Sequence, residues 1–189
     1  MATGGLLTIP RANVSLDPTK ELRLLHAFFG ETALPKSRGV AGASMPEPYR
    51  TLLVHNQHMT VTLEEHHKSP LKVVPYRVQR TGDVYGRKLD LLRGDGKTVM
   101  TGIMLVNFSF CDEEVRDEIL SEKKPLGRIL IEHGVLREVA AAAFVEIAAD
   151  DPLVARFKLP APRPAYGRLA EILCNGKPAI DLLEVVAPE

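Results

Sequence analysis

Two segments of this chain resemble each other, and their shared pattern limits the fold more than any other feature. One begins at Tyr85 and reads YGRKLDLLRGDGKTVMTGIMLV, and the other begins at Tyr166 and reads YGRLAEILCNGKPAIDLLEVVAP. Each contains Tyr-Gly-Arg, a strand-like run, a Gly-Lys turn and a second strand-like run. Because Asp95-Gly96 and Asn175-Gly176 accept positive φ in a tight turn, each segment predicts a β-hairpin. Two hairpins imply at least four antiparallel strands.

The residues that precede the first hairpin predict an arm, a helix and a loop. Residues 1–15 have no apolar period and are typical of a loose arm. Asp17 and Pro18 indicate a helix start, because the carboxylate caps free amides, and Gly30 ends that helix. The stretch 31–47 is rich in Gly, Pro and Ser and predicts a loop.

The middle of the chain adds helices and one more strand. From Tyr49 the apolar spacing predicts a helix that breaks near Asn56 and restarts with a cap at Thr60. VVPYRV, after Pro70, is typical of a strand. Further helices are predicted over 112–122, 125–134 and 137–149. This order favours an α+β fold: one antiparallel sheet built from hairpins, with helices covering one face.

Size and charge exclude several classes of protein. The 189 residues, 45% of them hydrophobic, suit a single domain over 1–189 that needs no disulfide or metal. Twenty-four basic residues balance 24 acidic ones, so we expect no nucleic-acid partner. The apolar stretch 139–149 is shorter than the roughly 20 residues of a membrane span, and the N-terminus has no secretory pattern. Cys111 and Cys174 form no CxxC, so we expect a protein of the reducing cytoplasm. We also expect a monomer or a small homo-oligomer.

Two charged residues occupy positions where the strand pattern expects hydrophobes. Strand alternation places Arg87 on the face of Leu89 and Leu91, and Glu184 on the face of Ile180 and Leu182. A buried ion costs several kcal/mol, roughly, unless it is paired or hydrogen-bonded. A small anionic ligand could be the partner that Arg87 needs.

Simpler interpretations of these charges stay open. Arg87 and Glu184 could pair with each other or with the backbone, or a frayed strand end could expose one of them. Arg168 holds the place in the second segment that Arg87 holds in the first, and its alternation places it with Ala170 and Ile172. For Arg168 we expect a surface arginine at the end of a hairpin rather than a site residue.

The histidines form no recognisable metal site. His55 and His58 lie three residues apart, and His66 and His67 follow, but no HExxH motif accompanies them. We therefore expect solvated histidines on helix faces. The GDGK turn lacks the glycine spacing of a phosphate-binding loop, and no nucleophile elbow supports a Ser-His-Asp triad. We predict no metal and no cofactor.

Four local patterns, in order, are similar to those of the chorismate pyruvate-lyase (4-hydroxybenzoate synthase) family. They are QHMTVTLEEHHKSPLKVVPYRV from Gln57, the Tyr85 hairpin, KKPLGRILIEHG from Lys123, and FVEIA from Phe144 with the hairpin that follows it. Together they span roughly residues 49–187. Each pattern alone is weak, and their ordered combination carries the resemblance. It implies an antiparallel sheet with helices that cover a buried ligand.

The resemblance also implies a site and a reaction. It assigns ligand contacts to Met59, Arg87, Leu126 and Glu184. The arginine and two main-chain amides, here those of Met59 and Leu126, would hold the carboxylate of an aromatic product, and the glutamate would face its 4-hydroxyl. The implied reaction eliminates pyruvate from chorismate to give 4-hydroxybenzoate, a precursor in ubiquinone or other aromatic biosynthesis. Arg87 and Glu184 would be the catalytic residues, with no metal or cofactor.

Two features depart from the family pattern. The spacing from Arg87 to Gly96 is one residue longer than that from Arg168 to Gly176, which a β-bulge could absorb. The proline-rich segment 150–165 is also longer and could reshape the covering of the pocket.

Two other functions compete with the lyase. One is a non-catalytic domain of the same fold that binds a small aromatic or carboxylate effector. Such domains accompany a DNA-binding helix-turn-helix in bacterial regulators, and the N-terminal part here is too short and too weakly basic to form one. The other is a thioesterase-like hot-dog enzyme, whose usual central helix and acidic or Asn site do not stand out in this sequence.

Overall fold

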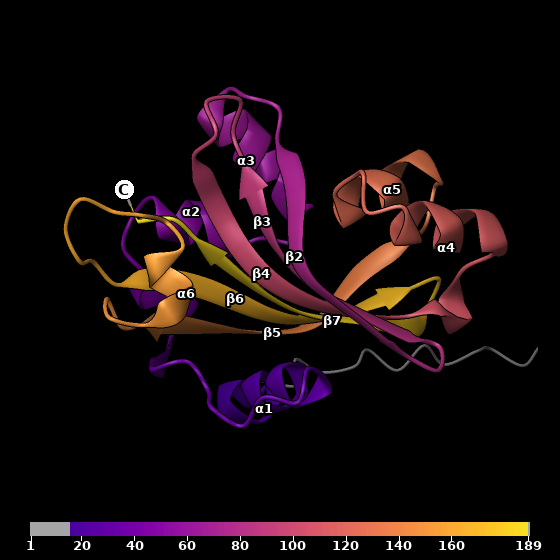
Figure 1. Ribbon diagram of the computed structural model, residues 1–189, viewed down its shortest axis with the longest axis horizontal. Coiled ribbons are helices and arrows are strands. Elements are labelled where there is room, and N and C mark those ends of the chain that lie inside the picture. Colours follow the sequence, from indigo (N-terminus) through magenta and orange to yellow (C-terminus); the bar gives the residue numbers. More distant parts are fainter. Residues whose placement is uncertain (1–15, 189) are drawn as a thin grey trace, which may run out of the picture.

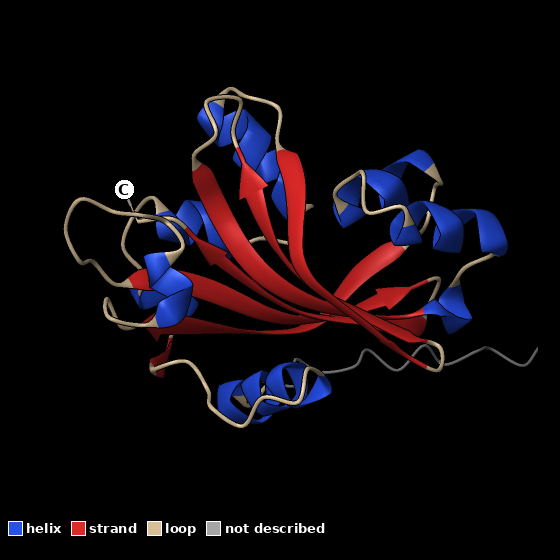
Figure 2. Ribbon diagram, in the orientation of Figure 1, coloured by secondary structure: helices blue, strands red, loops and turns tan. Residues whose placement is uncertain are grey.

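A computed structural model describes residues 16–188, and over this part of the chain seven strands form one antiparallel sheet (Figures 1 and 2). The arm expected over 1–15 lies outside the described residues. The strands are arranged in the order β1-β5-β6-β7-β4-β3-β2. Their bounds are β1 Ser37–Val40, β2 Lys72–Thr81, β3 Val84–Leu92, β4 Thr98–Asn107, β5 Arg137–Ile147, β6 Ala165–Cys174 and β7 Lys177–Val186.

Both predicted hairpins are present. The first joins β3 to β4 and the second joins β6 to β7, with positive φ at Gly96, Asn175 and Gly176 as tight turns require. The expected β-bulge does not absorb the extra residue of the first hairpin, because the register shift at Leu91/Leu92 has an equivalent at Ile172/Leu173 in the second. The turn absorbs it: Arg93 bonds to Lys97 around three residues, whereas Cys174 pairs with Lys177 around two. The strand predicted after Pro70 is β2, which pairs with β3 at the edge of the sheet.

Six helices accompany the sheet within the described residues. They are α1 Pro18–Phe28, α2 Tyr49–Leu53, α3 Met59–His67, α4 Glu113–Leu120, α5 Leu126–Glu132 and α6 Pro152–Ala155, with short 3-10 turns at Gly42–Ser44 and Phe108–Phe110. The predicted cap of α1 is confirmed, because Asp17 Oδ1 accepts from the amides of Thr19 and Lys20. None of these helices is long and apolar enough to cross a membrane.

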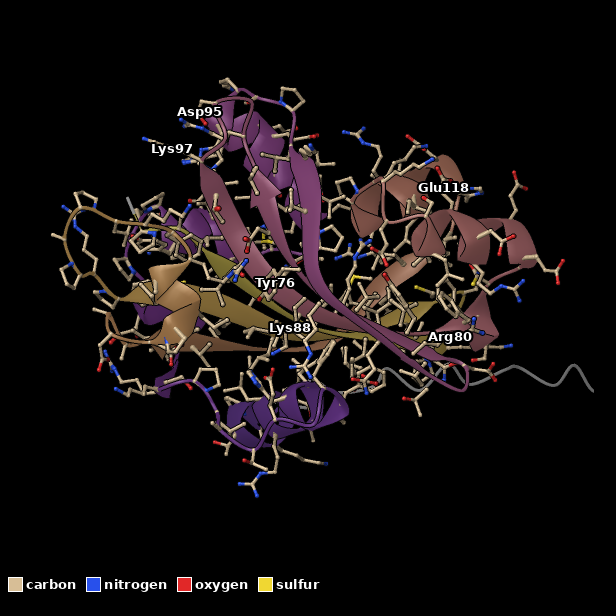
Figure 3. The ribbon with its side chains drawn as sticks, in the orientation of Figure 1. Tyr76, Arg80, Lys88, Asp95, Lys97 and Glu118 are labelled. Atoms are coloured by element: carbon tan, nitrogen blue, oxygen red, sulfur yellow. The ribbon has the colours of Figure 1, made fainter. Side chains whose placement is uncertain are left out.

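The sheet separates two hydrophobic cores. Buried residues of α2, α3, α4 and α5 pack on one face, whereas those of α1 and α6 form a second cluster with the other face. The predicted α+β sheet is confirmed, and α1 adds a helix on the face that was expected to lack one (Figure 1). Lys88 of β3 points toward α1 (Figure 3) and there binds Glu31 and lies over the ring of Phe29.

Three local expectations are wrong. The stretch 137–149 is not a helix, because it forms β5, which pairs with β1 on one side and β6 on the other. This pairing outweighs the helix propensity of its alanines. The expected loop at 31–47 contains β1. Thr60 is not the cap of α3, since the helix begins at Met59 and its N-cap is His58, two residues before Thr60.

Candidate functional site

A cavity of ≈ 70 Å³ lies between the sheet and the starts of α3 and α5. A single water needs roughly 10–15 Å³ on this scale, so the cavity has room for several waters or part of a small ring. Its wall is mainly apolar. The lining residues are His58, Met59, Thr60, Val73, Arg87, Leu89, Leu91, Met100, Gly102, Ile103, Met104, Pro125, Leu126, Gly127, Leu130, Arg137, Ile172, Ile180, Leu182, Leu183 and Glu184.

The four residues that the resemblance assigned to ligand contact all line this one cavity. Arg87 projects from β3 beside Leu89 and Leu91, and Glu184 projects from β7. Met59 and Leu126 are the first residues of α3 and α5. Strand alternation therefore placed Arg87 and Glu184 on the correct face of the sheet.

Arg87 is a fully buried cation with unused hydrogen-bond donors. Its side chain is 0% exposed, and its Nε and Nη1 have no hydrogen-bond partner among the described residues. Its Nη2 donates a long bond, 3.5 Å, to the main-chain oxygen of Lys124, and the hydroxyl of Tyr85 also interacts with the guanidinium. Burial lowers the pKa of Arg87 from its ordinary value, and nearby Tyr85 and Glu122 oppose this only in part. A guanidinium in this state favours the binding of an anion.

The two hairpins explain why Arg87 lacks a counter-ion. Arg168 lies directly across the strands from Glu184, and its Nε and Nη2 donate to Glu184 Oε2 at 3.0 and 2.6 Å. In the first hairpin the corresponding cross-strand neighbour of Arg87 is Met104. A thioether cannot neutralise a guanidinium. Two similar hairpins thus hold one paired and one unpaired arginine.

This arrangement corrects two sequence interpretations. Arg168 is not a surface residue, since it is 1% exposed and forms the ion pair with Glu184. Arg87 and Glu184 are therefore not each other's ion-pair partners within the described residues. Glu184 already has an ion-pair partner inside the protein, which is Arg168. Arg87 forms no ion pair with a carboxylate among the described residues.

The starts of two helices complete one wall of the cavity. Neither His58 before α3 nor Pro125 before α5 caps its helix with a side-chain hydrogen bond. The first-turn amides of an α-helix lack partners within the helix and carry partial positive charge. Near Arg87, they reinforce a wall that favours negative charge.

Sequence reasoning missed the two other ionisable side chains of the lining, those of Arg137 and His58. Arg137 was expected at the start of a helix, but it opens β5 and donates to the carbonyl oxygens of Asn56 and Gln57. Burial and then Arg168 lower its pKa, while Glu184 opposes this. His58 is not on a solvated helix face; burial and Arg137 lower its pKa, which favours the neutral imidazole.

In the described part of the chain, no group of three or more His, Cys, Asp or Glu side chains is placed to hold a metal ion. His55 is engaged otherwise, because its ring bonds to the oxygen of Leu52 and the amide of Gln57. The site is therefore a mainly apolar cavity with two arginines, one histidine and one paired glutamate.

Comparison with known proteins addresses the fold. No protein-family model matches the sequence, and no curated protein matches it significantly. PhnF from Mycobacterium smegmatis superposes with a TM-score of 0.53 at 11% identity, over 69% of this chain and 63% of that chain. The possible transcriptional regulator YydK from Bacillus subtilis gives 0.44 at 11% identity, over 61% and 57%. The ligand-binding domain of a Bordetella bronchiseptica protein assigned to the GntR family of transcriptional regulators gives 0.47 at 12%, over 63% and 86%.

The chain thus spans about three fifths of the length of PhnF and of YydK. The likeness to PhnF confirms the expected chorismate lyase-like α+β fold. No matching family model or curated protein supports membership of the chorismate pyruvate-lyase family itself.

Proposed function

We propose that this protein binds a small anionic ligand in the cavity and acts as an effector-sensing domain without catalysing a reaction. The observation that carries the proposal is Arg87, fully buried in the cavity wall with two guanidinium nitrogens unpartnered among the described residues. Burying such a charge is costly, and a carboxylate that accepts from one of these nitrogens together with Nη2, whose present bond to Lys124 is long, would offset much of that cost.

The rest of the wall indicates what the ligand carries besides its anion. Apolar side chains from β3, β4, β6 and β7 surround the space beyond Arg87, which suits a flat apolar or aromatic body. At Glu184, Arg168 binds Oε2, so Oε1 can accept a hydrogen bond from a ligand hydroxyl. A compact aromatic carboxylate satisfies both requirements, with amides at Met59 and Leu126 as further contacts for its carboxylate.

Binding accounts for this site without a chemical step. Glu184 is part of a buried ion pair with Arg168, an arrangement that orients a side chain and is common in structural roles. The buried charge of Arg87 is balanced by a bound anion alone, without any reaction of that anion. We therefore place sensing ahead of catalysis.

The test is isothermal titration of the purified protein with 4-hydroxybenzoate and with 4-hydroxybenzamide. The two molecules have similar shapes, but only the first carries the charge. We expect the acid to bind and the amide not to bind, and Arg87→Met to abolish the difference. Equal binding of acid and amide would refute the proposal.

Pyruvate elimination from chorismate is the second candidate function. The observation that favours it is that Met59, Arg87, Leu126 and Glu184 meet at one cavity, as the resemblance implies for a lyase. Arg87 would then anchor a substrate carboxylate, and Glu184 would face the departing ether oxygen. Incubation with chorismate, followed for pyruvate and 4-hydroxybenzoate together, separates the two functions. Formation of both products at equal rates would establish the lyase, and binding without products would support sensing.

A further inference from the structure

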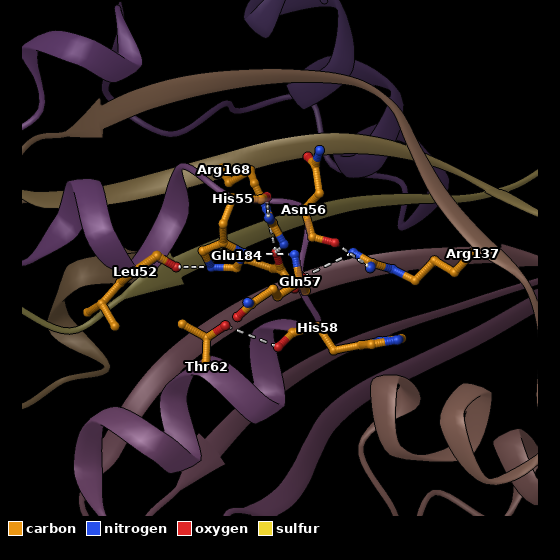
Figure 4. Close-up of polar contacts among 9 residues, drawn as sticks. All are labelled: Leu52, His55, Asn56, Gln57, His58, Thr62, Arg137, Arg168 and Glu184. Atoms are coloured by element: carbon orange, nitrogen blue, oxygen red, sulfur yellow. Dashed lines mark hydrogen bonds and ion pairs between the residues drawn. The ribbon is translucent and has the colours of Figure 1, made fainter.

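The connector between α2 and α3, residues 54–58, is fastened to the sheet through its main chain (Figure 4). Arg168 Nη1 donates to the carbonyl oxygen of His55 at 2.8 Å. Arg137 Nη1 and Nη2 donate to the next two carbonyl oxygens, those of Asn56 and Gln57, at 3.0 and 3.3 Å. Two arginines from neighbouring strands thus bind three successive carbonyls.

The ring of His55 fastens the connector internally. Its Nδ1 lies 3.1 Å from the amide nitrogen of Gln57, which donates to it, and its Nε2 lies 2.7 Å from the carbonyl oxygen of Leu52. These partners require an acceptor at Nδ1 and a donor at Nε2, which is one tautomer of the neutral imidazole. Burial, and next the charge of Arg168, lower the pKa of His55 and favour that neutral form.

The connector ends where the cavity begins. Its last residue, His58, is the N-cap of α3, and both His58 and Met59 line the cavity. Arg137 also lines the cavity and has no ion pair with a carboxylate among the described residues. Both of its terminal nitrogens are engaged by the connector. Its planar fork suits two adjacent carbonyls, which a lysine ammonium cannot reproduce.

We propose that Arg137 is a positioning residue for the ligand site: by holding Asn56 and Gln57 it fixes the start of α3 against the cavity, and Arg168 supports it through His55. This inference rests on the proposed function, because the position of Met59 matters only if the cavity binds a ligand. Displacement of a binding group by about 1 Å weakens its interactions severely.

The test compares Arg137→Lys and Arg137→Met with the wild type in 4-hydroxybenzoate titration and in hydrogen exchange of the amides of residues 55–60. Lysine keeps the charge but loses the fork. If Arg137 acts by positioning, both variants lose affinity by about tenfold or more and both exchange faster over 55–60. Arg77→Met is the matched control, because Arg77 also holds a loop carbonyl, that of Phe29, away from this cavity. It should leave both readouts unchanged.

Two outcomes would overturn the inference. Full affinity in Arg137→Lys with loss in Arg137→Met would assign Arg137 a purely electrostatic role. Loss of affinity with unchanged exchange over 55–60 would assign it a direct ligand contact. Failure of the proposed function looks different: the wild type would bind no 4-hydroxybenzoate, while the faster exchange in the Arg137 variants would still be observed.

Discussion

Arg168 lies across from Glu184 in one hairpin, whereas Arg87, at the corresponding place in the other hairpin, lies across from Met104. The first arginine is neutralised by an ion pair inside the protein, whereas the second forms no ion pair with a carboxylate among the described residues and leaves its Nε and Nη1 without hydrogen-bond partners. This difference between two similar hairpins gives the cavity its unmatched positive charge. Arg168 therefore serves as an internal reference in every test of Arg87.

Met104→Glu should block ligand binding, because it gives Arg87 an internal counter-ion. A carboxylate placed across from Arg87 reproduces the geometry that Arg168 and Glu184 already have, so it would occupy the guanidinium in place of a ligand. We expect the affinity for 4-hydroxybenzoate to fall by at least about a hundredfold, the usual effect of losing a charged hydrogen-bond partner. Met104→Gln, which adds a polar group of similar size without charge, should lose much less. Similar losses in the two variants would argue against charge neutralisation.

Removal of the two arginines should change stability in opposite directions. Arg87→Met replaces an uncompensated buried charge with an apolar side chain, and we expect the free energy of unfolding to rise by about 1–3 kcal/mol. Arg168→Met leaves Glu184 unpaired and should lower it by about 3–5 kcal/mol. Urea unfolding of both variants measures this. Destabilisation of Arg87→Met to the level of Arg168→Met would mean that Arg87 has an internal partner.

Asp181 of β7 should make stability depend on pH. Burial, with Glu21 and Glu171 adding repulsion, raises the pKa of Asp181 from 3.8 to about 6. A raised carboxyl pKa means that the folded state tolerates the charged form poorly, so stability is lost as pH rises from 3.8 through 6. Asp181→Asn should therefore be more stable than wild type at pH 8, by about 1 kcal/mol after solvent screening. The advantage should disappear below pH 4, as urea unfolding at several pH values would show.

If Asp181→Asn follows the wild type at every pH, the carboxyl group of Asp181 is not under repulsion in the folded protein.

Mild acid should weaken the connector through His55. The pKa of His55 is lowered from 6.5, so its contribution to stability is fully present above pH 6.5 and is lost as pH falls through 6.5 toward the folded-state value. Protonation of Nδ1 also removes the acceptor for the amide of Gln57. We expect hydrogen exchange over 55–60 to accelerate between pH 7 and pH 5.5, after correction for the intrinsic rate. His55→Asn, which keeps an acceptor near Nδ1, should show a smaller acceleration, and an equal one would exclude His55 as the cause.

The face of the sheet on which Arg87 and Glu184 lie could be predicted from sequence, because side chains alternate with a period of two along a strand whatever it pairs with. The partner of each charged side chain could not be predicted from sequence. Arg168 and Glu184 meet through the pairing of β6 with β7, and nothing local in YGR distinguishes a buried arginine from an exposed one. The alignment of the two hairpins holds the signal: across from Arg168 stands a glutamate, and across from Arg87 a methionine.

The other errors have the same origin. The alanine-rich stretch 137–149 has high helix propensity, and only its pairing with two strands distant in sequence makes it β5. With β5 taken for a helix, Arg137 had no reason to meet the connector, 80 residues earlier in the chain. Local patterns thus predicted the hairpins and the cap of α1, whereas contacts between distant segments decided which charges form the site.

The most direct measurement of the central claim is the NMR signal of the Arg87 side-chain Nε–H during titration with 4-hydroxybenzoate. Assignment by comparison with Arg87→Lys identifies the signal, and the Nε–H of Arg168, already bonded to Glu184, serves as the internal reference. A ligand carboxylate on Arg87 should shift its Nε–H strongly and slow its exchange with water, with little change at Arg168. Saturation of the protein with ligand while the Arg87 signal stays unchanged would contradict the account.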